Sequence, residues 1–398
     1  MSRAKFALEL TIVCLLGHEL CTDAIGSSVT KNETHFTYWC VGSCEEDAKP
    51  KSTEPGIILM GGGTDTDDAF KQHILWSGSG DFLVLRASGD DAYNPYIRAL
   101  AETHSVATLL TKDKRAASDS RVLAIVDRAD AIFFAGGDQW TYLQEWQGTP
   151  LQQHVQAAIN ERGVPVGGTS AGCDVQGGAI YTAAQDSVVS DEALADPFNF
   201  RVTVQRRPFL NHTTGTPPHA PLPSPPAAAA QTSAGSVPTW NRTELLLSTA
   251  IIDTHFVTRD RMGRLVAFLA RLRSDLRRPD AVAIGIDEQT AIAIDRSGNG
   301  TLLRQSEDGG RAFVLTPAAG VSPKTCEQGK ELEFADIPVQ KLDAAYGDSY
   351  NFAAMTGGAA SQSYTISAKK GKLTPSDPYS PLKDKRAQAA AGHILRRP

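Results

Sequence analysis

The sequence has little of what a disulfide-built, membrane-spanning or nucleic-acid-binding protein needs. Its 398 residues include six cysteines, which are too few to hold a fold together by disulfide bonds. The net charge of -6 argues against nucleic acid or an anionic membrane surface as a partner. No apolar run approaches the roughly 18 residues of a membrane-spanning helix. Since 41% of the residues are hydrophobic, the composition favours a globular protein with a sizeable core.

Motifs for zinc and for nucleotides are missing as well. Cys40 and Cys44 are not accompanied by a second pair of cysteines or histidines, so we expect no zinc site. Their spacing allows them to close a small loop, and a bond from one of them to Cys326 is the alternative. The glycine run from Gly61 to Gly63 has neither G-x-G-x-x-G spacing nor a following Gly-Lys-Ser/Thr. A phosphate-binding loop is therefore a poor interpretation of it.

Residues 1–24 have the pattern of a secretory signal. Two basic residues precede an apolar run from Phe6 to Gly17. Glu9 lies inside that run and leaves a buried first helix as the alternative. Four glycosylation sequons in polar or turn-like sequence agree with secretion: Asn32-Glu-Thr34, Asn211-His-Thr213, Asn241-Arg-Thr243 and Asn299-Gly-Thr301. We expect a glycoprotein that is secreted or resides in a secretory compartment.

Short apolar strands alternate with helical stretches from Pro55 onward. The expected strands are Gly56 to Met60, Phe82 to Ala87, Ser105 to Leu110 and Ala131 to Ala135. Nearly continuous apolar strands separated by helices are typical of a parallel sheet that is covered on both faces. The sequence thus predicts an α/β fold. Its ligand should bind beyond the carboxyl ends of the strands, where Gly- and Asp-rich sequence follows.

The stretch from Val164 to Asp174 predicts a strand, a sharp turn and a helix around Ser170. Its turn reads G-x-S-x-G, the pattern that lifts a serine hydroxyl clear of a sheet. The helix that begins at Ala171 directs free backbone amides at an oxyanion beside the serine. We expect Gly62 and Gly63 to supply a further amide through close backbone approach. The simpler interpretation is a Gly-rich turn without catalysis.

Composition divides the rest of the chain. Residues 206–240 are rich in Pro, Ala, Ser and Thr and predict a flexible insertion. Residues 346–398 are predicted to be a polar, basic tail, and residues 25–54 an N-terminal extension. The main α/β domain is then expected to cover residues 55–345.

Two further segments carry chemical groups. The sequence from Asp253 to Leu265 follows an apolar strand and holds one histidine and three arginines: His255, Arg259, Arg261 and Arg264. Helical spacing places Arg261 and Arg264 on one face. A second apolar strand, Ala281 to Ile286, ends in Asp287 and Glu288.

Four motifs in order carry a family resemblance: Gly136-Gly-Asp-Gln139, Gly168-Thr-Ser-Ala-Gly172, D-x-H-F-x-x-R-x-R-x-G-R-L from Asp253, and Gly285-Ile-Asp-Glu288. The set resembles the cyanophycinase-like branch of the serine peptidase family that includes aspartyl dipeptidase (peptidase E). The resemblance spans roughly residues 56–294. It implies a three-layer α/β/α sandwich related to class I glutamine amidotransferases, and hydrolysis of aspartyl or isoaspartyl peptide bonds. It implies neither a metal nor an organic cofactor.

Matching motifs also suggest roles for individual residues. Ser170 resembles the nucleophile, His255 the general base and Glu288 the third triad member, with Asp287 as the alternative acid. The resemblance implies a substrate-binding set of Gln139, Asp253, Arg259, Arg261 and Arg264. Thr254 stands where cyanophycinases usually carry Gln, and the insertion precedes this motif. Both departures favour small isoaspartyl peptides over cyanophycin as the substrate.

Other interpretations stay open. An α/β-hydrolase esterase shares G-x-S-x-G, and its base would be His393 because the histidine comes last in that family. A non-catalytic protein that binds the same peptides is the second alternative. A homodimer is an alternative to a monomer.

The composition of the insertion yields a first prediction. Replacing residues 213–237 by a short Gly/Ser linker should leave kcat/KM for a dipeptide nearly unchanged, because this segment has almost no large apolar side chains to bury. Turnover of dipeptides and of longer peptides by the deletion variant checks this. A large loss for dipeptides would contradict it, and a loss confined to long substrates would identify a lid.

Overall fold

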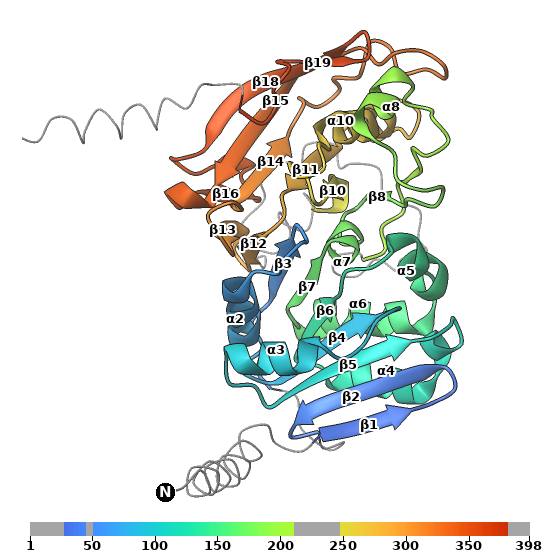
Figure 1. Ribbon diagram of the computed structural model, residues 1–398, viewed down its shortest axis with the longest axis vertical. Coiled ribbons are helices and arrows are strands. Elements are labelled where there is room, and N and C mark those ends of the chain that lie inside the picture. The colour runs from blue at the N-terminus through green and yellow to red at the C-terminus, as the bar shows by residue number, and fades with distance from the viewer. Residues whose placement is uncertain (1–27, 45–50, 211–246, 381–398) are drawn as a thin grey trace, which may run out of the picture.

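The computed structural model describes residues 28–44, 51–210 and 247–380 (Figure 1). The predicted signal, the sequons at Asn211 and Asn241, most of the insertion and His393 lie outside the described residues. No helix in these described ranges is long and apolar enough to cross a membrane.

The larger of two main sheets has eleven strands within the described ranges. In spatial order they are β1 (Ser28–Asn32), β2 (Phe36–Gly42), β5 (Ser105–Thr111), β4 (Asp81–Arg86), β6 (Ala131–Phe134), β7 (Val166–Thr169), β3 (Gly56–Met60), β12 (Thr290–Asp295), β13 (Asn299–Arg304), β16 (Ser349–Asn351) and β17 (Thr356–Gly357). The five central strands from β5 to β3 are parallel. On either side β2 and β12 join them antiparallel, so the sheet is mixed at its edges.

Helices cover both faces of this sheet, as the sequence predicts. They are α2 (Asp67–Trp76), α3 (Tyr93–Leu100), α4 (Ser120–Arg128), α5 (Gln139–Trp146) and α6 (Pro150–Arg162), with the short 3-10 helix η1 (Ala116–Ser118) before α4. Along β3 the side chains of Ile58 and Met60 pack with α2 and α3, whereas Ile57 and Leu59 pack with α4, α5 and α6. This alternation follows from the two-residue period of a strand. The α/β fold with helices on both faces is confirmed.

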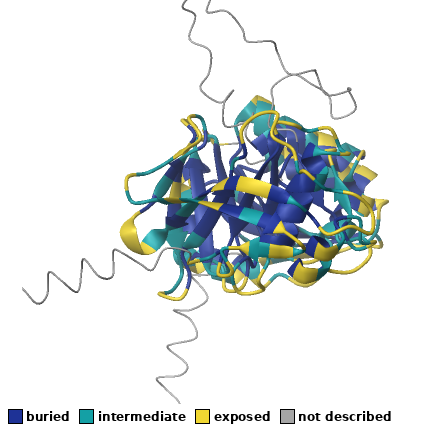
Figure 2. Cartoon of the chain, turned by 90° about the horizontal axis from the view of Figure 1, so that it is seen from above, coloured by how far each residue is buried: buried dark blue, intermediate teal, exposed yellow. Residues whose placement is uncertain are grey.

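A second sheet of six strands contains the later part of the chain. Its order is β10 (Ala250–Asp253), β11 (Val282–Ile286), β14 (Arg311–Leu315), β15 (Phe334–Asp343), β18 (Gln362–Lys369) and β19 (Lys372–Thr374). The helices α8 (Ser190–Ala195) and α10 (Met262–Arg273) pack on it with their own apolar core. The remaining elements are α7 (Ala171–Asp174), the two-stranded sheet of β8 (Ile180–Tyr181) and β9 (Val204–Gln205), and the 3-10 helix η2 (Ala344–Tyr346). Figure 1 shows this second sheet, from the yellow β10 to the red β19, above the blue and green parallel strands of the first. Figure 2 shows buried residues filling the interior.

Two of the expected domain limits differ from the structure. Part of the predicted N-terminal extension is β2, which pairs with β5 over seven residues. Part of the predicted basic tail is β18, which pairs with β15 and buries Ile366 and Ala368. In β18 the polar composition hid the alternation of buried and more exposed side chains. The β2 segment is mostly apolar and aromatic, and its side chains are mostly buried. Cys40 and Cys44 form a disulfide while Cys326 is a free thiol, which settles the two pairing alternatives.

A buried group of charges joins the two sheets. Asp174 on α7, Asp253 at the end of β10 and Arg264 on α10 are each at most 3% exposed. Arg264 binds Asp253 through two hydrogen bonds, Nε to Oδ2 at 2.8 Å and Nη2 to Oδ1 at 2.5 Å. Arg261 adds a hydrogen bond to the Thr254 carbonyl oxygen at 2.8 Å. Because an unpaired buried charge is costly, these bonds fix α10 against β10. Asp174 on α7 interacts with the same charges and with the Thr254 side chain.

Asp174 is the titrating member of this group. Burial, and next the neighbouring Asp253, raise its pKa to about 7, although Arg261 and Arg264 act in the opposite direction. In the unfolded chain the carboxyl loses its proton near pH 4. Between about pH 4 and 7 the folded protein therefore binds more protons at Asp174 than the unfolded one, so this group lowers stability as the pH rises.

The Asp174→Asn variant should lose this dependence. Asparagine is neutral at every pH. The free energy of unfolding of the variant, relative to that of wild type, should therefore increase between pH 5 and pH 7.5 by up to about 1.4 kcal/mol per pH unit. Urea unfolding at both pH values measures the difference. Asp336→Asn, at an exposed aspartate, is the control and should follow wild type. Parallel curves for wild type and Asp174→Asn would contradict the assignment.

Candidate active site

Close backbone packing at the end of β7 shapes the turn that carries Ser170. Ser170 has φ 51° and ψ -122°, a conformation that non-glycine residues rarely adopt. Gly168 lies against the backbone of Gly172, and Gly172 lies against the carbonyl group of Phe134. A side-chain carbon at either glycine would overlap these backbone atoms. The two glycines of G-x-S-x-G are thus needed for the turn to close.

Ser170, His255 and Glu288 form one line of hydrogen bonds. The Ser170 Oγ and His255 Nε2 atoms are 2.7 Å apart, and His255 Nδ1 is 2.5 Å from Glu288 Oε1. The serine follows β7 of the first sheet, whereas His255 follows β10 and Glu288 follows β11 of the second. With its Nδ1 proton donated to Glu288, the imidazole has Nε2 free to accept the serine proton. The structure therefore brings together the three residues that the sequence singled out.

The imidazole is kept neutral by its surroundings. Burial lowers the pKa of His255, and the charges of Arg259 and Arg261 act in the same direction. The hydrogen bond to Glu288 opposes this shift without reversing it. A neutral imidazole near pH 7 is the form that can accept a proton.

Asp287 and Glu288 have different tasks although they are neighbours. The Asp287 carboxylate is buried and accepts the backbone amides of Val257 and Thr258, both at 3.0 Å. It also pairs with Arg311 Nη2 at 2.9 Å. Asp287 thus holds the turn that follows the histidine, and Glu288 is the carboxylate that contacts the ring.

The glycine loop after β3 lies directly against the triad. A side-chain carbon at Gly62 would overlap the His255 ring, and one at Gly63 would press on Glu288. The carbonyl oxygens of Gly61 and Gly62 accept the amides of His255 and Gln289 at 2.8 and 2.9 Å. Each N–H group in a trans peptide points away from the carbonyl of the same unit, so the amides of Gly62 and Gly63 point away from these partners. Within the described part of the chain, they donate no hydrogen bond, and neither does the Ala171 amide.

The expected substrate-binding arginines occupy different environments. Arg259 is 54% exposed, and its Nε lies 3.6 Å from Glu288 Oε1. Arg261 is mostly buried, and Arg264 is fully buried against Asp253. The expectation that Asp253, Arg261 and Arg264 face the substrate is not met, because they neutralise one another in the interior. Arg259 is the member of the cluster that reaches the surface beside the triad.

Gln139 lies where the sequence places it, at the first turn of α5 beyond β6. Its Nε2 donates to the Tyr181 carbonyl oxygen at 3.3 Å, and the residue is partly exposed. Asp138 caps the same helix by accepting the Trp140 amide at 2.9 Å. Gln139 is thus fixed at the carboxyl edge of the sheet.

Sequence reasoning overlooked Asp174 and Asp65. Asp174 follows Ser170 by four residues, which is about one helical turn. This spacing could have indicated an acid close to the nucleophile. Asp65 follows the glycine loop and accepts the Tyr93 hydroxyl at 2.6 Å, and burial raises its pKa. An acidic residue in a loop after a parallel strand could have indicated a position near the ligand site. Asp174 donates its backbone amide to the Ser170 carbonyl oxygen at 2.9 Å, and Asp65 lies in the loop next to Gly63.

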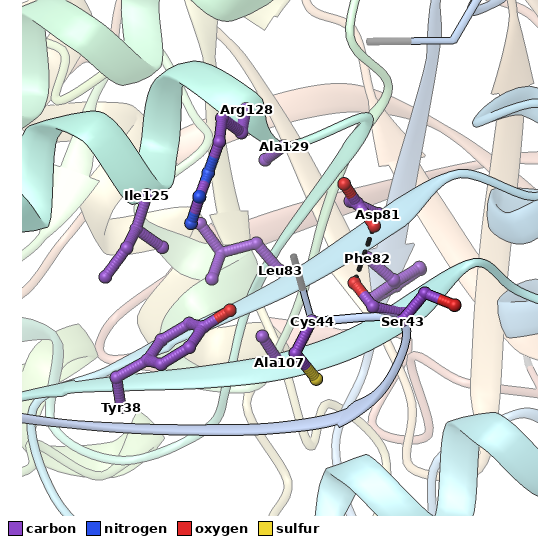
Figure 3. Close-up of a pocket in the computed structure, with 11 residues that line it drawn as sticks. Tyr38, Ser43, Cys44, Asp81, Phe82, Leu83, Ala107, Ile125, Arg128 and Ala129 are labelled. Atoms are coloured by element: carbon purple, nitrogen blue, oxygen red, sulfur yellow. Dashed lines mark hydrogen bonds between the residues drawn. The ribbon is translucent and has the colours of Figure 1, made fainter. Parts of the chain in front are cut away.

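A small cavity elsewhere in the sheet is not part of this site. It has a volume of about 20 Å³ and lies between β2, the starts of β4 and β5, and α4 (Figure 3). Asp81 within it accepts the Ser105 hydroxyl at 2.6 Å. Its position at the amino ends of the parallel strands is opposite to the edge that carries Ser170. It has room for about one water molecule.

Comparison with known proteins agrees with this geometry. Residues 82–215 match the model of peptidase family S51. The chain is 23% identical over 261 residues to a cyanophycinase of Trichormus variabilis, covering 63% of this chain and 70% of the relative. It is 24% identical over 258 residues to a cyanophycinase of Geminocystis herdmanii, covering 64% and 73%.

Two solved structures show a weaker similarity to this chain. A peptidase from an acI-B1 actinobacterium aligns with a TM-score of 0.42 and 13% identity, over 67% of this chain and 92% of that one. A candidate peptidase E of Listeria monocytogenes aligns with a TM-score of 0.37 and 14% identity, over 64% and 100%. These alignments carry no weight beside the sequence matches. The family match over residues 82–215 and the cyanophycinase relatives together support a serine-type peptidase that is similar to family S51.

Proposed function

We propose that the protein hydrolyses aspartyl or isoaspartyl peptide bonds with Ser170 as nucleophile, His255 as general base and Glu288 as the orienting acid. The observation that supports it is the unbroken line from Ser170 Oγ through both nitrogens of His255 to Glu288 Oε1. A serine hydroxyl is a weak nucleophile until an adjacent base takes its proton. The carboxylate fixes the imidazole in the tautomer that can do so.

The reaction follows from these contacts. His255 Nε2 takes the Ser170 proton while Oγ attacks the peptide carbonyl carbon, and the resulting oxyanion is accepted by backbone amides. The free amides of Gly62, Gly63 and Ala171 are the proposed donors. His255 then gives its proton to the leaving amine, and a water molecule hydrolyses the acyl-enzyme by the same steps.

Arg259 is the proposed substrate-recognition residue. An isoaspartyl linkage leaves the α-carboxylate of aspartate free, and an α-aspartyl linkage leaves its side-chain carboxylate free. A guanidinium group binds such a carboxylate through two parallel hydrogen bonds. Because Arg261 and Arg264 are occupied in the interior, Arg259 has the exposed guanidinium that could bind the substrate. Gln139 lies at the same edge of the sheet and is proposed to line the pocket.

We also propose that the protein passes through the secretory pathway and carries glycans. Asn32 and Asn299, the two sequon asparagines within the described ranges, are both exposed. The Asn32 side chain accepts Lys112 Nζ at 2.6 Å at the tip of the first hairpin. An exposed asparagine in a sequon is the form that a glycan requires. Loss of mass on treatment of the secreted protein with an N-glycosidase would support this.

The assignment of the triad is tested by replacing the neighbouring acids Glu288 and Asp287, each by its amide. Glu288→Gln should lower kcat about a hundredfold or more, because glutamine does not fix the required tautomer. Asp287→Asn should lose less, since it retains an oxygen for the Val257 and Thr258 amides. Ser170→Ala should lower kcat on the order of 10⁴-fold. Steady-state hydrolysis of an isoaspartyl dipeptide measures all three. A larger loss in Asp287→Asn than in Glu288→Gln, or activity in Ser170→Ala, would contradict the assignment.

Recognition by Arg259 has its own test. Arg259→Lys should lower kcat/KM for an isoaspartyl dipeptide about tenfold or more, because an ammonium group replaces two directed hydrogen bonds by a point charge. Hydrolysis of a neutral activated ester should barely change. Arg296→Lys, at an exposed arginine after β12, is the control and should match wild type on both substrates. Equal losses on ester and dipeptide would assign Arg259 to the support of Glu288 instead.

A further inference from the structure

The turn that carries His255 has a strained backbone. His255 has φ 48°, and Asp260 five residues later also has φ 48°. Residues other than glycine avoid this region and adopt it only where surrounding contacts enforce it. The position of the imidazole therefore depends on what holds residues 255–262.

Several contacts come from the main part of the chain. The Gly61 carbonyl oxygen accepts the His255 amide at 2.8 Å, and Asp287 accepts the two amides of Val257 and Thr258. The Ser190 hydroxyl, at the start of α8, donates to the Asp260 carbonyl oxygen. These contacts hold the beginning and the middle of the turn.

A further contact comes from the far end of the described chain. Tyr379 accepts the Met262 amide at 2.9 Å and donates its hydroxyl proton to Asp260 Oδ1 at 2.8 Å. Met262 is the first residue of α10, where backbone amides have no partner within the helix. One hydroxyl group thus joins the end of the strained turn to the start of the helix that follows it.

The aromatic ring of Tyr379 also packs against the turn. Its centroid lies 5.9 Å from that of Phe256 and 5.8 Å from that of Phe313, both edge-on. Phe256 directly follows His255 and packs on Gly285, where no side chain would fit beside the ring. The segment that carries Tyr379 is held by the Tyr364 hydroxyl, which donates to the Pro378 carbonyl oxygen at 2.6 Å. The chain after β19 therefore returns to the catalytic turn and is fastened there.

We propose that Tyr379 is a positioning residue for His255, so that the C-terminal segment completes the active site. The inference rests on the proposed function, in which His255 is the general base. Loss of the Tyr379 hydroxyl leaves the Met262 amide and Asp260 without this partner and relaxes the strained turn. The imidazole then meets Ser170 Oγ less often at bonding distance, which slows proton transfer without altering substrate contacts.

Tyr379→Phe tests this, with Tyr350→Phe as the matched control. Tyr379→Phe keeps the ring and removes the hydroxyl group. Tyr379 is partly buried, whereas Tyr350 on β16 is fully buried. The Tyr350 hydroxyl has no hydrogen-bond partner within the described ranges, so its removal should lower neither activity nor stability. Three quantities are measured for each variant: the Tm, the rate at which a fluorophosphonate labels Ser170, and kcat and KM for an isoaspartyl dipeptide.

The expected result is a labelling rate and a kcat about tenfold or more lower in Tyr379→Phe, with KM unchanged, because small displacements of a catalytic group are costly. A lower Tm with wild-type labelling and kcat would overturn the proposal and leave Tyr379 a structural role. Full retention of all three quantities would overturn it too. Failure of the proposed function is distinguishable, since wild type would then resist labelling in the same way as Ser170→Ala.

Discussion

The hydrogen bond between Ser170 and His255 spans two separate sheets, and the rest of the structure serves to keep that distance at 2.7 Å. The serine belongs to the parallel sheet, and the histidine and its carboxylate belong to the smaller one. Backbone bonds from the glycine loop to His255 and Gln289 join the two sides beside the triad. Behind the triad, the buried Asp174 on the side of the first sheet interacts with Asp253, Arg261 and Arg264 on the side of the second. A hydrolase built this way depends on the docking of two sheets as much as on the local turn that exposes its serine.

The same junction explains how the arginines divide. Arg264 and Arg261 follow His255 closely in sequence, yet they compensate Asp253 and Asp174 in the interior. Arg259 is left at the surface beside Glu288. The proposed specificity for a carboxylate and the stability of the sheet junction therefore depend on different members of one short motif. The His255 imidazole is neutral because burial lowers its pKa, and the positive charges of Arg259 and Arg261 act in the same direction.

Much of the fold and of the site was predictable because short stretches of sequence determine it. The parallel strands and the turn at Ser170 each follow from a few neighbouring residues. His255 and Glu288 were identified through the motifs that resemble a known peptidase family. The orientation of Arg264 was not predictable, since helical spacing says which residues share a face but not whether that face is buried. The strands after Gly347 were missed because Ser, Thr and Lys dominate their composition while only Ile366 and its neighbours alternate inward. Tyr379 contacts residues more than a hundred positions away, and no local pattern reports such a contact.

The central claim is that Ser170 carries the acyl group of an aspartyl substrate during turnover. Rapid acid quenching of the enzyme with an isoaspartyl dipeptide, followed by mass spectrometry of its peptides, tests this most directly. The account predicts an aspartyl adduct on the peptide that contains Ser170 and none in Ser170→Ala, which should also be inactive. Hydrolysis of the dipeptide by Ser170→Ala at the wild-type rate, with no adduct on either protein, would contradict it.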